Sequence, residues 1–322
     1  MSGATTGIRG VAYALPKQRL SLSELETLGK LESDPALLEQ FGFSHVYAAE
    51  DETPYSLALT AATRLLDEQE VPASSIDTLL YCGTPSVAFA RAGCAVNAVE
   101  RIATTRRFEY PATRLQYELG MGCASAVALD QLACTSLFAA VRMARALVET
   151  EEARRVLCVA SEFFPARDSR EAIYNCTADA ACAVLVEGAA DRNRIRATTQ
   201  ITKGYYWEGE ALRNEIVASY FPTAKHVIVE TLRRAGWSPN DVRWVIPHNV
   251  SIRSWEILLG LAGIPRERLW CANVARIGHT LAGDNFINLR DAIDDGSVRP
   301  GDRLLLFAYG YGAHWTALAL EA

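Results

Sequence analysis

Residues 232–250 read LRRAGWSPNDVRWVIPHNV, and they repeat the pattern of residues 66–84, LDEQEVPASSIDTLLYCGT. Each stretch runs from the end of a helix through a polar turn and a short polar link into a buried strand that ends in a loop. Ile76 corresponds to Val242, 166 positions further on. Because similarity at a fixed distance indicates an internal repeat, the two stretches predict a duplicated α/β fold.

A second pair of segments supports this duplication. Residues 137–160 end in RRVLCVA, and residues 285–308 end in DRLLLFA, so that Phe138 corresponds to Phe286, 148 positions further on. The two distances differ by 18, which places about 18 extra residues between the matched segments of the first half. We expect them within residues 87–107, which contain four arginines: Arg91, Arg101, Arg106 and Arg107. The alternative is a chance similarity between two ordinary α/β segments.

Helical and strand-like patterns alternate along the whole chain. Amphipathic stretches cover residues 56–69 and 136–150, and the short apolar runs typical of buried strands lie at residues 78–82, 155–160, 182–186, 244–247, 303–308 and 315–320. This alternation is typical of the α/β class. We therefore predict two similar halves, residues 1–168 and 169–322, which meet near residues 165–175 and pack face to face.

The composition excludes several classes of protein. Half of the 322 residues are hydrophobic and 22% are charged, so the chain can bury a sizeable core and is not disordered. The net charge of −6 argues against non-specific nucleic-acid binding, although a local basic patch for an acidic cofactor stays possible. No apolar run approaches the roughly 18 residues of a membrane span.

The eight cysteines are expected to be reduced. The first residues lack the pattern of a secretory signal, which predicts a cytoplasmic protein in which thiols stay free. No cysteine or histidine spacing matches a zinc site, so no metal is expected. Most of these thiols should therefore be small buried hydrophobic groups, and the question is whether one of them is different.

Cys134 is the candidate nucleophile. It lies in LDQLACTSLFAAVRMARALVE, where a strand-like segment at residues 127–133 gives way to a helix. A helix N-terminus favours the thiolate through its dipole and its free N–H groups, and the small Thr135 and Ser136 leave room for a substrate. Another inert buried cysteine is the alternative.

Two histidines are candidates for the same site. His248 follows a predicted strand in VIPHN and is expected at a loop mouth. His279 precedes Asp284 by five positions, and a carboxylate at that distance can bind one ring nitrogen and make the other more basic. The alternatives are a strand-end histidine with a satisfied hydrogen bond for His248, and a simple helix cap for Asp284.

A glycine-containing loop is the remaining candidate element. Residues 308–315, AYGYGAHW, connect two apolar strands, and the backbone N–H groups of Gly310, Tyr311 and Gly312 could form part of an oxyanion hole. A tight hairpin turn is the simpler explanation.

The chain as a whole resembles the thiolase-like condensing enzymes, specifically the β-ketoacyl-acyl-carrier-protein synthase III group, from about Ile8 to Leu320. The resemblance depends on six motifs: YPATRLQYELG (110–120), ACTSL around Cys134, VASE (159–162), VIPHNVSIR (245–253), GHT at Gly278 and VRPGDRLLLFAYGYG (298–312). It implies two equivalent α/β halves in a five-layer αβαβα sandwich, and a homodimer.

The resemblance also implies roles for single residues. Cys134 matches the family's acyl-accepting nucleophile, whereas Cys123 lies too early to do so. His248 matches the family's first histidine. Arg253 matches a basic residue that contacts the phosphopantetheine donor, a CoA or acyl-carrier-protein thioester. No bound cofactor is implied, because the thioester is a substrate.

The sequence departs from the family pattern in four places. His279 stands where synthase III members usually have Asn, and with Asp284 it resembles an offshoot from secondary metabolism that includes starter-unit synthases and enzymes that acylate hydroxyls. The extra residues before Tyr110 also fit that offshoot. Residues 35–42, PALLEQFG, lack the Trp and Arg that bind the CoA adenine, so a carrier-protein donor is at least as suitable. Tyr311 replaces a Gly of the oxyanion loop.

Three functions follow from this resemblance. The first is an acyltransferase that forms acyl-Cys134 and condenses it with a malonyl thioester, as a 3-oxoacyl synthase of fatty-acid or polyketide biosynthesis. The second transfers the same acyl group to a hydroxyl or an amine, with His279 as the general base. The third is a catalytically silent partner subunit, against which the intact Cys134 and both histidines count.

Overall fold

The computed structural model describes residues 5–83, 110–164, 169–209 and 211–322. The extra segment expected at residues 87–107 lies outside the described residues. The strands are β1 (Gly7–Ala14), β2 (Gln18–Ser21), β3 (His45–Ala48), β4 (Thr78–Gly83), β5 (Ser125–Leu129), β6 (Arg155–Glu162), β7 (Glu171–Ala172), β8 (Asn175–Cys176), β9 (Ala180–Glu187), β10 (Arg194–Thr202), β11 (Trp244–Pro247), β12 (Arg303–Gly310) and β13 (His314–Glu321). The helices are α1 (Leu22–Thr27), α2 (Pro35–Gln40), α3 (Pro54–Glu68), α5 (Pro111–Glu118), α6 (Ser136–Glu149), α7 (Arg213–Ala235), α8 (Ile252–Ala262), α9 (Ala272–Arg276) and α10 (Asp284–Asp294).

The sheet shows the duplication directly. Its nine described strands run in the order β11-β12-β13-β10-β1-β9-β6-β4-β5. The order β1-β9-β6-β4 in the first half matches β10-β13-β12-β11 in the second. In both halves the two innermost strand pairings are antiparallel, and the third pairing, β4 with β6 or β11 with β12, is parallel. The two half-sheets meet where β1 pairs with β10.

The two repeat distances found in the sequence equal the distances between corresponding strands and helices of the two halves. β4 begins at Thr78 and β11 at Trp244, 166 positions apart. α6 begins at Ser136 and α10 at Asp284, 148 positions apart. The duplicated α/β prediction is therefore confirmed, and chance similarity is excluded.

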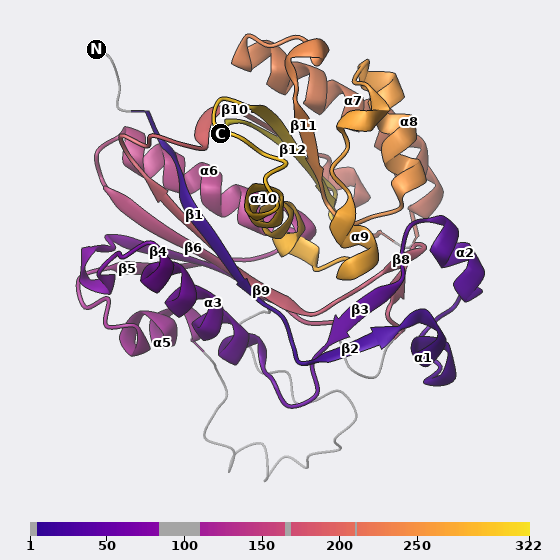
Figure 1. Cartoon of the computed structure of the whole chain (residues 1–322), viewed down its shortest axis with the longest axis horizontal. Coiled ribbons are helices and arrows are strands. Elements are labelled where there is room, and N and C mark those ends of the chain that lie inside the picture. The colour runs from indigo at the N-terminus through magenta and orange to yellow at the C-terminus, as the bar shows by residue number, and fades with distance from the viewer. Residues whose placement is uncertain (1–4, 84–109, 165–168, 210) are drawn as a thin grey trace.

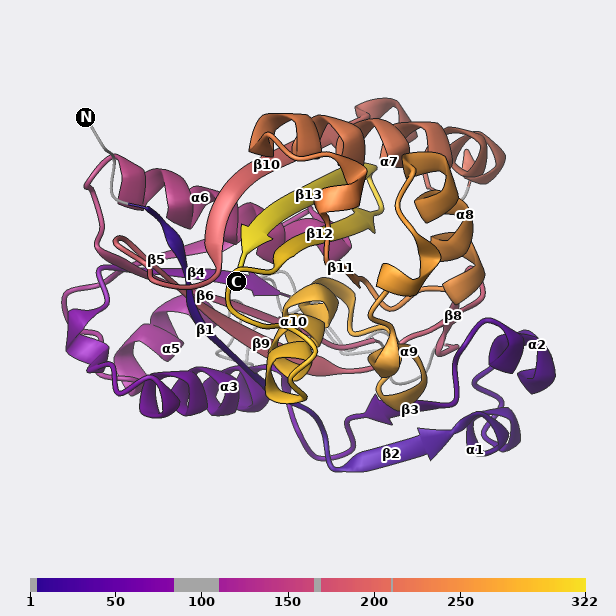
Figure 2. The same ribbon diagram turned by 45° about the horizontal axis from the view of Figure 1, so that its top comes forward.

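The elements stack in five layers (Figures 1 and 2). α3 and α5 pack on the outer face of the first half-sheet, and α7 and α8 pack on the outer face of the second. α6 and α10 lie between the two half-sheets and share one apolar core with the inner faces of both. This arrangement is the predicted αβαβα sandwich of the thiolase-like fold. Among the described residues, no helix is both long and apolar enough to cross a membrane.

The predicted boundary between the halves is too early. We expected it at residues 168/169, but β9 (Ala180–Glu187) pairs with β1 and β6 and so belongs to the first half-sheet. The first half ends with an antiparallel strand that returns to the centre of the sheet, as β13 does in the second half. The boundary therefore lies in the connection from β9 to β10.

The two central helices meet through equivalent residues. Phe138 of α6 and Phe286 of α10 are both buried, and their ring centroids are 5.2 Å apart.

We expect Phe286→Ala to lower the free energy of unfolding by about 3–5 kcal/mol, because it leaves a cavity between the half-sheets. Urea unfolding followed by circular dichroism measures this loss. Ile293→Ala, on an exposed position of the same helix, is the control and should cost about 1 kcal/mol or less. Equal losses would contradict the packing described here.

Candidate active site

Cys134 lies where the first half's chain turns into α6. β5 ends at Leu129, a short 3-10 helix covers Ala133–Thr135, and α6 follows at once. The thiol is buried, with 8% of the residue exposed, and its Sγ lies 3.4 Å from Nε2 of His279. The predicted position at the start of a helix is therefore observed, and the thiol has a basic partner from the other half of the molecule.

Asp284 completes a hydrogen-bonded chain behind this pair. Its Oδ2 lies 2.5 Å from Nδ1 of His279, and the carboxylate is fully buried. Oδ1 accepts hydrogen bonds from N and Oγ1 of Thr280 at 2.6 and 2.7 Å, and Oδ2 also accepts one from N of Asn249 at 2.6 Å. Asp284 begins α10 but caps none of its N–H groups, so the helix-cap interpretation is wrong. The arrangement is a Cys–His–Asp relay.

The charge distribution of this relay favours proton transfer from Cys134 to His279. Burial lowers the pKa of His279, but the Asp284 carboxylate and the Cys134 sulfur outweigh burial and hold that pKa well above its usual value. A basic imidazole beside a thiol stabilises the imidazolium–thiolate pair. The arrangement can therefore supply a thiol nucleophile together with its base.

His248 is the neutral histidine of the site. It follows β11, is 2% exposed, and its ring centroid lies 6.1 Å from that of His279. Trp255 and Phe307 pack edge-on against it. Burial, and then the charge of His279, lower the pKa of His248 to about 3. Its Nδ1 is buried without a hydrogen-bond partner among the described residues, so the alternative of a satisfied strand-end histidine does not hold for that nitrogen.

The glycine loop lies directly against the nucleophile. A side chain at Gly310 would come within 2.7 Å of the Leu132 carbonyl oxygen and 3.2 Å of the Cys134 nitrogen, so only glycine permits this approach. Gly312 has a φ of 117°, which also favours glycine. The loop backbone thus lies against that of Cys134, so the N–H groups of both stay our candidates for an oxyanion hole.

Most other cysteines are buried thiols of low reactivity. Burial raises the pKa of the Cys82, Cys176 and Cys271 thiols, to about 12 for the first two, and it raises the pKa of Cys158 and Cys182 as well. Cys123 is exposed. Among the described cysteines, Cys134 alone contacts a histidine ring nitrogen.

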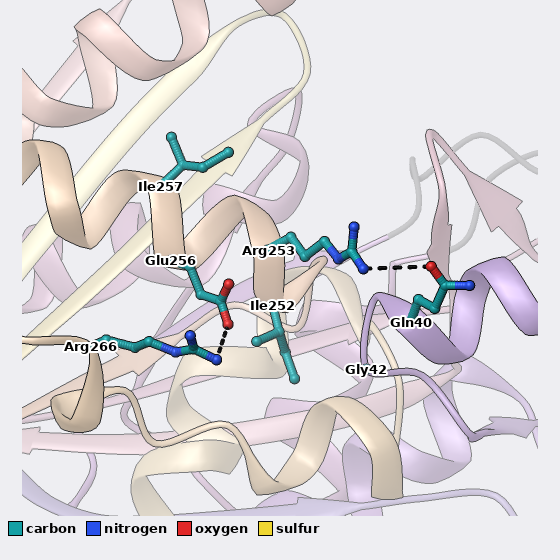
Figure 3. Close-up of a pocket in the computed structure, with 7 residues that line it drawn as sticks. All are labelled: Gln40, Gly42, Ile252, Arg253, Glu256, Ile257 and Arg266. Atoms are coloured by element: carbon teal, nitrogen blue, oxygen red, sulfur yellow. Dashed lines mark hydrogen bonds and ion pairs between the residues drawn. The ribbon is translucent and has the colours of Figure 1, made fainter.

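A surface pocket of about 550 Å³ contains Arg253 (Figure 3). One wall is the end of α2 and the turn after it, with Gln40 and Gly42, and the other is α8, with Arg253. The walls are joined by a hydrogen bond from Ile252 N to Phe41 O, 2.9 Å long. The structure therefore brings together residues 35–42 and Arg253, which we interpreted separately from the sequence.

Two family models match this chain. The model described as 3-oxoacyl-[acyl-carrier-protein (ACP)] synthase III matches residues 130–204, which include Cys134. The model of its C-terminal part matches residues 232–322, which include His248, His279 and Asp284. The chain belongs to the β-ketoacyl-acyl-carrier-protein synthase III family.

Similar proteins cover nearly the whole length of this synthase III chain. The β-ketoacyl-[acyl-carrier-protein] synthase III of Aquifex aeolicus (strain VF5) is 27% identical, over 98% of this chain and 99% of its own. The crystal structure of 3-oxoacyl-[acyl-carrier-protein] synthase III from Aquifex aeolicus VF5 has a TM-score of 0.82 at 24% identity, covering 98% of this chain and 100% of that one. ChlB3, described as an acyltransferase, has a TM-score of 0.83 at 20% identity, covering 99% and 98%.

Several residues that shape this synthase III site were missed from the sequence. Asn249 binds Asp284 through its backbone and the Gly278 carbonyl through its side chain, at 2.7 Å. Asn288 holds Asn249 in turn, with a 2.8 Å bond to its Oδ1. The adjacency of Asn249 to His248 and the spacing of Asn288, four positions after Asp284, were the available signals.

The two histidines should separate the two steps of the reaction. We expect His248→Ala to change the rate of Cys134 acylation less than about fivefold, because His279 and Asp284 stay in place, and to slow condensation about 100-fold or more through the loss of one hydrogen-bond donor. Single-turnover acylation and product formation, measured on the same preparation, give both rates. A variant that loses acylation and condensation equally would contradict this division.

Proposed function

We propose that this protein is a condensing enzyme of the synthase III type, which loads an acyl group from a thioester onto Cys134 and joins it to a malonyl thioester. One observation carries the proposal: at the junction of the halves, His279 lies against the Cys134 thiol, and the ring centroid of His248 lies 6.1 Å from that of His279. Loading requires a base, and condensation requires hydrogen-bond donors for an enolate oxygen.

Acylation uses the relay. The Cys134 proton passes to His279, and Sγ attacks the carbonyl carbon of the acyl thioester. Backbone N–H groups near Cys134 and in the Gly310–Gly312 loop hold the resulting oxyanion. The carbon–sulfur bond to the carrier thiol then breaks, and His279 returns the proton to that thiol. The product is acyl-Cys134, the covalent intermediate of ping-pong catalysis.

Condensation uses both histidines as donors. The malonyl thioester loses CO₂, and the electron pair of the broken carbon–carbon bond forms an enolate. After loading, His279 takes up a proton from solvent at Nε2, and N–H groups of His248 and His279 then bind the thioester oxygen, on which negative charge develops. The enolate carbon attacks acyl-Cys134 and the bond to Sγ breaks. His279 passes its proton to Sγ, so the 3-oxoacyl thioester leaves and the thiol is regenerated.

A coupled measurement tests this proposal. Protein first loaded with an acyl thioester is mixed with malonyl thioester, and CO₂ and the extended product are quantified together. We expect one CO₂ and one 3-oxoacyl thioester for each acyl group consumed. Loss of the acyl group to added alcohols or amines, with no CO₂, would contradict the proposal.

That outcome would support a second candidate function. The Asp284 carboxylate holds the pKa of His279 well above its usual value, and such a histidine is a suitable base for a hydroxyl or an amine. Acyl transfer to a heteroatom would then replace condensation after the same acyl-Cys134 intermediate.

The Arg253 pocket is our candidate for the donor's binding site. The guanidinium of Arg253 faces Gln40 across the pocket, at 3.5 Å (Figure 3). A guanidinium that lines a solvent-open pocket suits the phosphates of CoA or of a carrier-bound phosphopantetheine. Which of the two donors is used can be tested by comparing the acylation rates that each supports in wild type and in Arg253→Ala.

We also propose a homodimer that forms along β5. This strand lies at the edge of the described sheet, and 41% of Val127 is exposed. An exposed edge strand offers unpaired N–H and C=O groups to a second copy. Sedimentation should give about twice 35.2 kDa for wild type and 35.2 kDa for Val127→Lys, whereas the control Val229→Lys on α7 should stay dimeric. A monomeric wild type would contradict this.

A further inference from the structure

Glu162 is a carboxylate beside the relay that the mechanism above does not use. It is the last residue of β6, in the VASE segment of the first half. Its Oε2 accepts a hydrogen bond from the backbone N–H of Ala282 at 3.1 Å. Ala282 belongs to the second half, in the 3-10 turn Leu281–Gly283 that separates His279 from Asp284. Glu162 therefore reaches across the junction of the halves to the turn that carries the catalytic pair.

The turn that Glu162 binds has an unfavourable backbone conformation. Leu281 has a φ of 58°, in the left-handed region that residues with a side chain rarely adopt. Such a conformation is unfavourable and persists only where its surroundings hold it. The hydrogen bond from Ala282 to Glu162, directly after Leu281, is one of the contacts that do so.

Charged and titratable groups surround the Glu162 carboxyl. His279 and Asp284 face it from the turn and α10, Asp130 from the residues after β5, and Tyr81 and Cys82 from β4. Burial raises the pKa of Glu162 to about 7, the Asp284 and Asp130 charges act in the same direction, and the Ala282 hydrogen bond and His279 oppose them. Its charge therefore changes near neutral pH, beside the histidine that activates Cys134.

We propose that Glu162 is a positioning residue for thiol activation: it holds the Leu281–Gly283 turn, and with it His279, against Cys134, and its negative charge stabilises the imidazolium form of His279. The charged form is present above the pKa of Glu162 and is lost as the pH falls through it. Cys134 reactivity should therefore rise with pH around 7. The inference deepens the proposed function, since it concerns the same nucleophile.

Alkylation by iodoacetamide tests the inference without any acyl substrate. The rate at which the Cys134 peptide is carboxamidomethylated is measured by mass spectrometry from pH 5.5 to 9. The exposed Cys123 peptide of the same molecules serves as an internal reference. Failure of the proposed acyl chemistry and failure of this inference are thereby distinguished.

Two substitutions at Glu162 and one control separate charge from position. Glu162→Gln keeps an oxygen for the Ala282 N–H but no charge, so we expect Cys134 to react about tenfold more slowly at pH 8, without the rise near pH 7. Glu162→Ala loses both the charge and the hydrogen-bond acceptor, so its Cys134 should react about 100-fold more slowly than that of wild type at every pH. Glu171→Gln is the control, since Glu171 also accepts backbone N–H bonds, from Glu32 and Ser33, and should keep the wild-type profile.

Three results would overturn the inference. They are a wild-type profile without a rise near pH 7, a Glu162→Gln profile that keeps that rise, and equal rates for Glu162→Ala and wild type. Thermal unfolding of each variant identifies one that fails to fold. If Glu162→Ala does not fold, the Glu162→Gln profile alone decides.

Discussion

Replacing Cys134 with alanine is expected to reduce acyl transfer by about 10⁵-fold or more, because the variant lacks the thiol that the proposed mechanism acylates. Cys134 is the described cysteine whose sulfur lies within 3.4 Å of a histidine nitrogen, at the start of α6. The variant should bind thioesters and fold as wild type does, since alanine fills most of the thiol's space. Product quantified by mass spectrometry under multiple-turnover conditions measures the loss.

Cys123→Ala is the matched control for this experiment. Cys123 is exposed and lies eleven positions earlier in the chain, so the variant should keep full activity. If Cys123→Ala loses acyl transfer and Cys134→Ala keeps it, the nucleophile has been assigned to the wrong cysteine.

Asp284→Asn is expected to slow acylation by about 10³–10⁴-fold at neutral pH. The amide lacks the charge that raises the pKa of His279, so that pKa falls and the imidazolium–thiolate pair is no longer favoured. An unassisted thiol ionises only near its ordinary pKa of about 8.5. The variant should therefore keep gaining activity up to pH 9, whereas wild type should rise near pH 7 and reach its plateau by about pH 8. Single-turnover acylation across this pH range measures both effects.

Asp291→Asn on the same helix is the control for the loss of a carboxylate. Asp291 is half-buried and accepts hydrogen bonds from Tyr13 and Asn273, at 2.9 and 2.7 Å, and within the described part of the chain it makes no hydrogen bond with His279. The Asp291→Asn variant should have a lower free energy of unfolding but the same pH profile of acylation as wild type. An Asp284→Asn enzyme whose profile matches wild type would show that the carboxylate does not set the basicity of His279.

The sequence was sufficient for the architecture because the duplication involves whole elements. The correspondence of Phe138 with Phe286 depends on helix and strand periodicity, which survives divergence of the individual residues, and these two side chains meet at the centre of the molecule. The boundary at residues 168/169 was wrong because strand patterns do not show which half-sheet a strand joins. β9 is apolar and buried from Ala180 to Val186, a pattern that suits either half.

The sequence predicted those parts of the site that depend on residues close together in the chain. Cys134 at a helix start and the His279–Asp284 pair are local features, with a spacing that a turn can close. Glu162 and Asn249 bind backbone atoms of residues 120 and 29 positions further along the chain, and such contacts leave no pattern in the sequence. The helix-cap interpretation of Asp284 failed because its carboxylate is already bound by His279, Thr280 and Asn249.

The central claim is that acyl groups pass through a covalent bond to Cys134. Intact mass of wild-type protein, taken seconds after mixing with an acyl thioester and followed by peptide mapping, tests it most directly. The account predicts a mass increase of one acyl group, located on the Cys134 peptide, that disappears when malonyl thioester is added. No increase with any acyl thioester, or an acyl group on another residue, would contradict it.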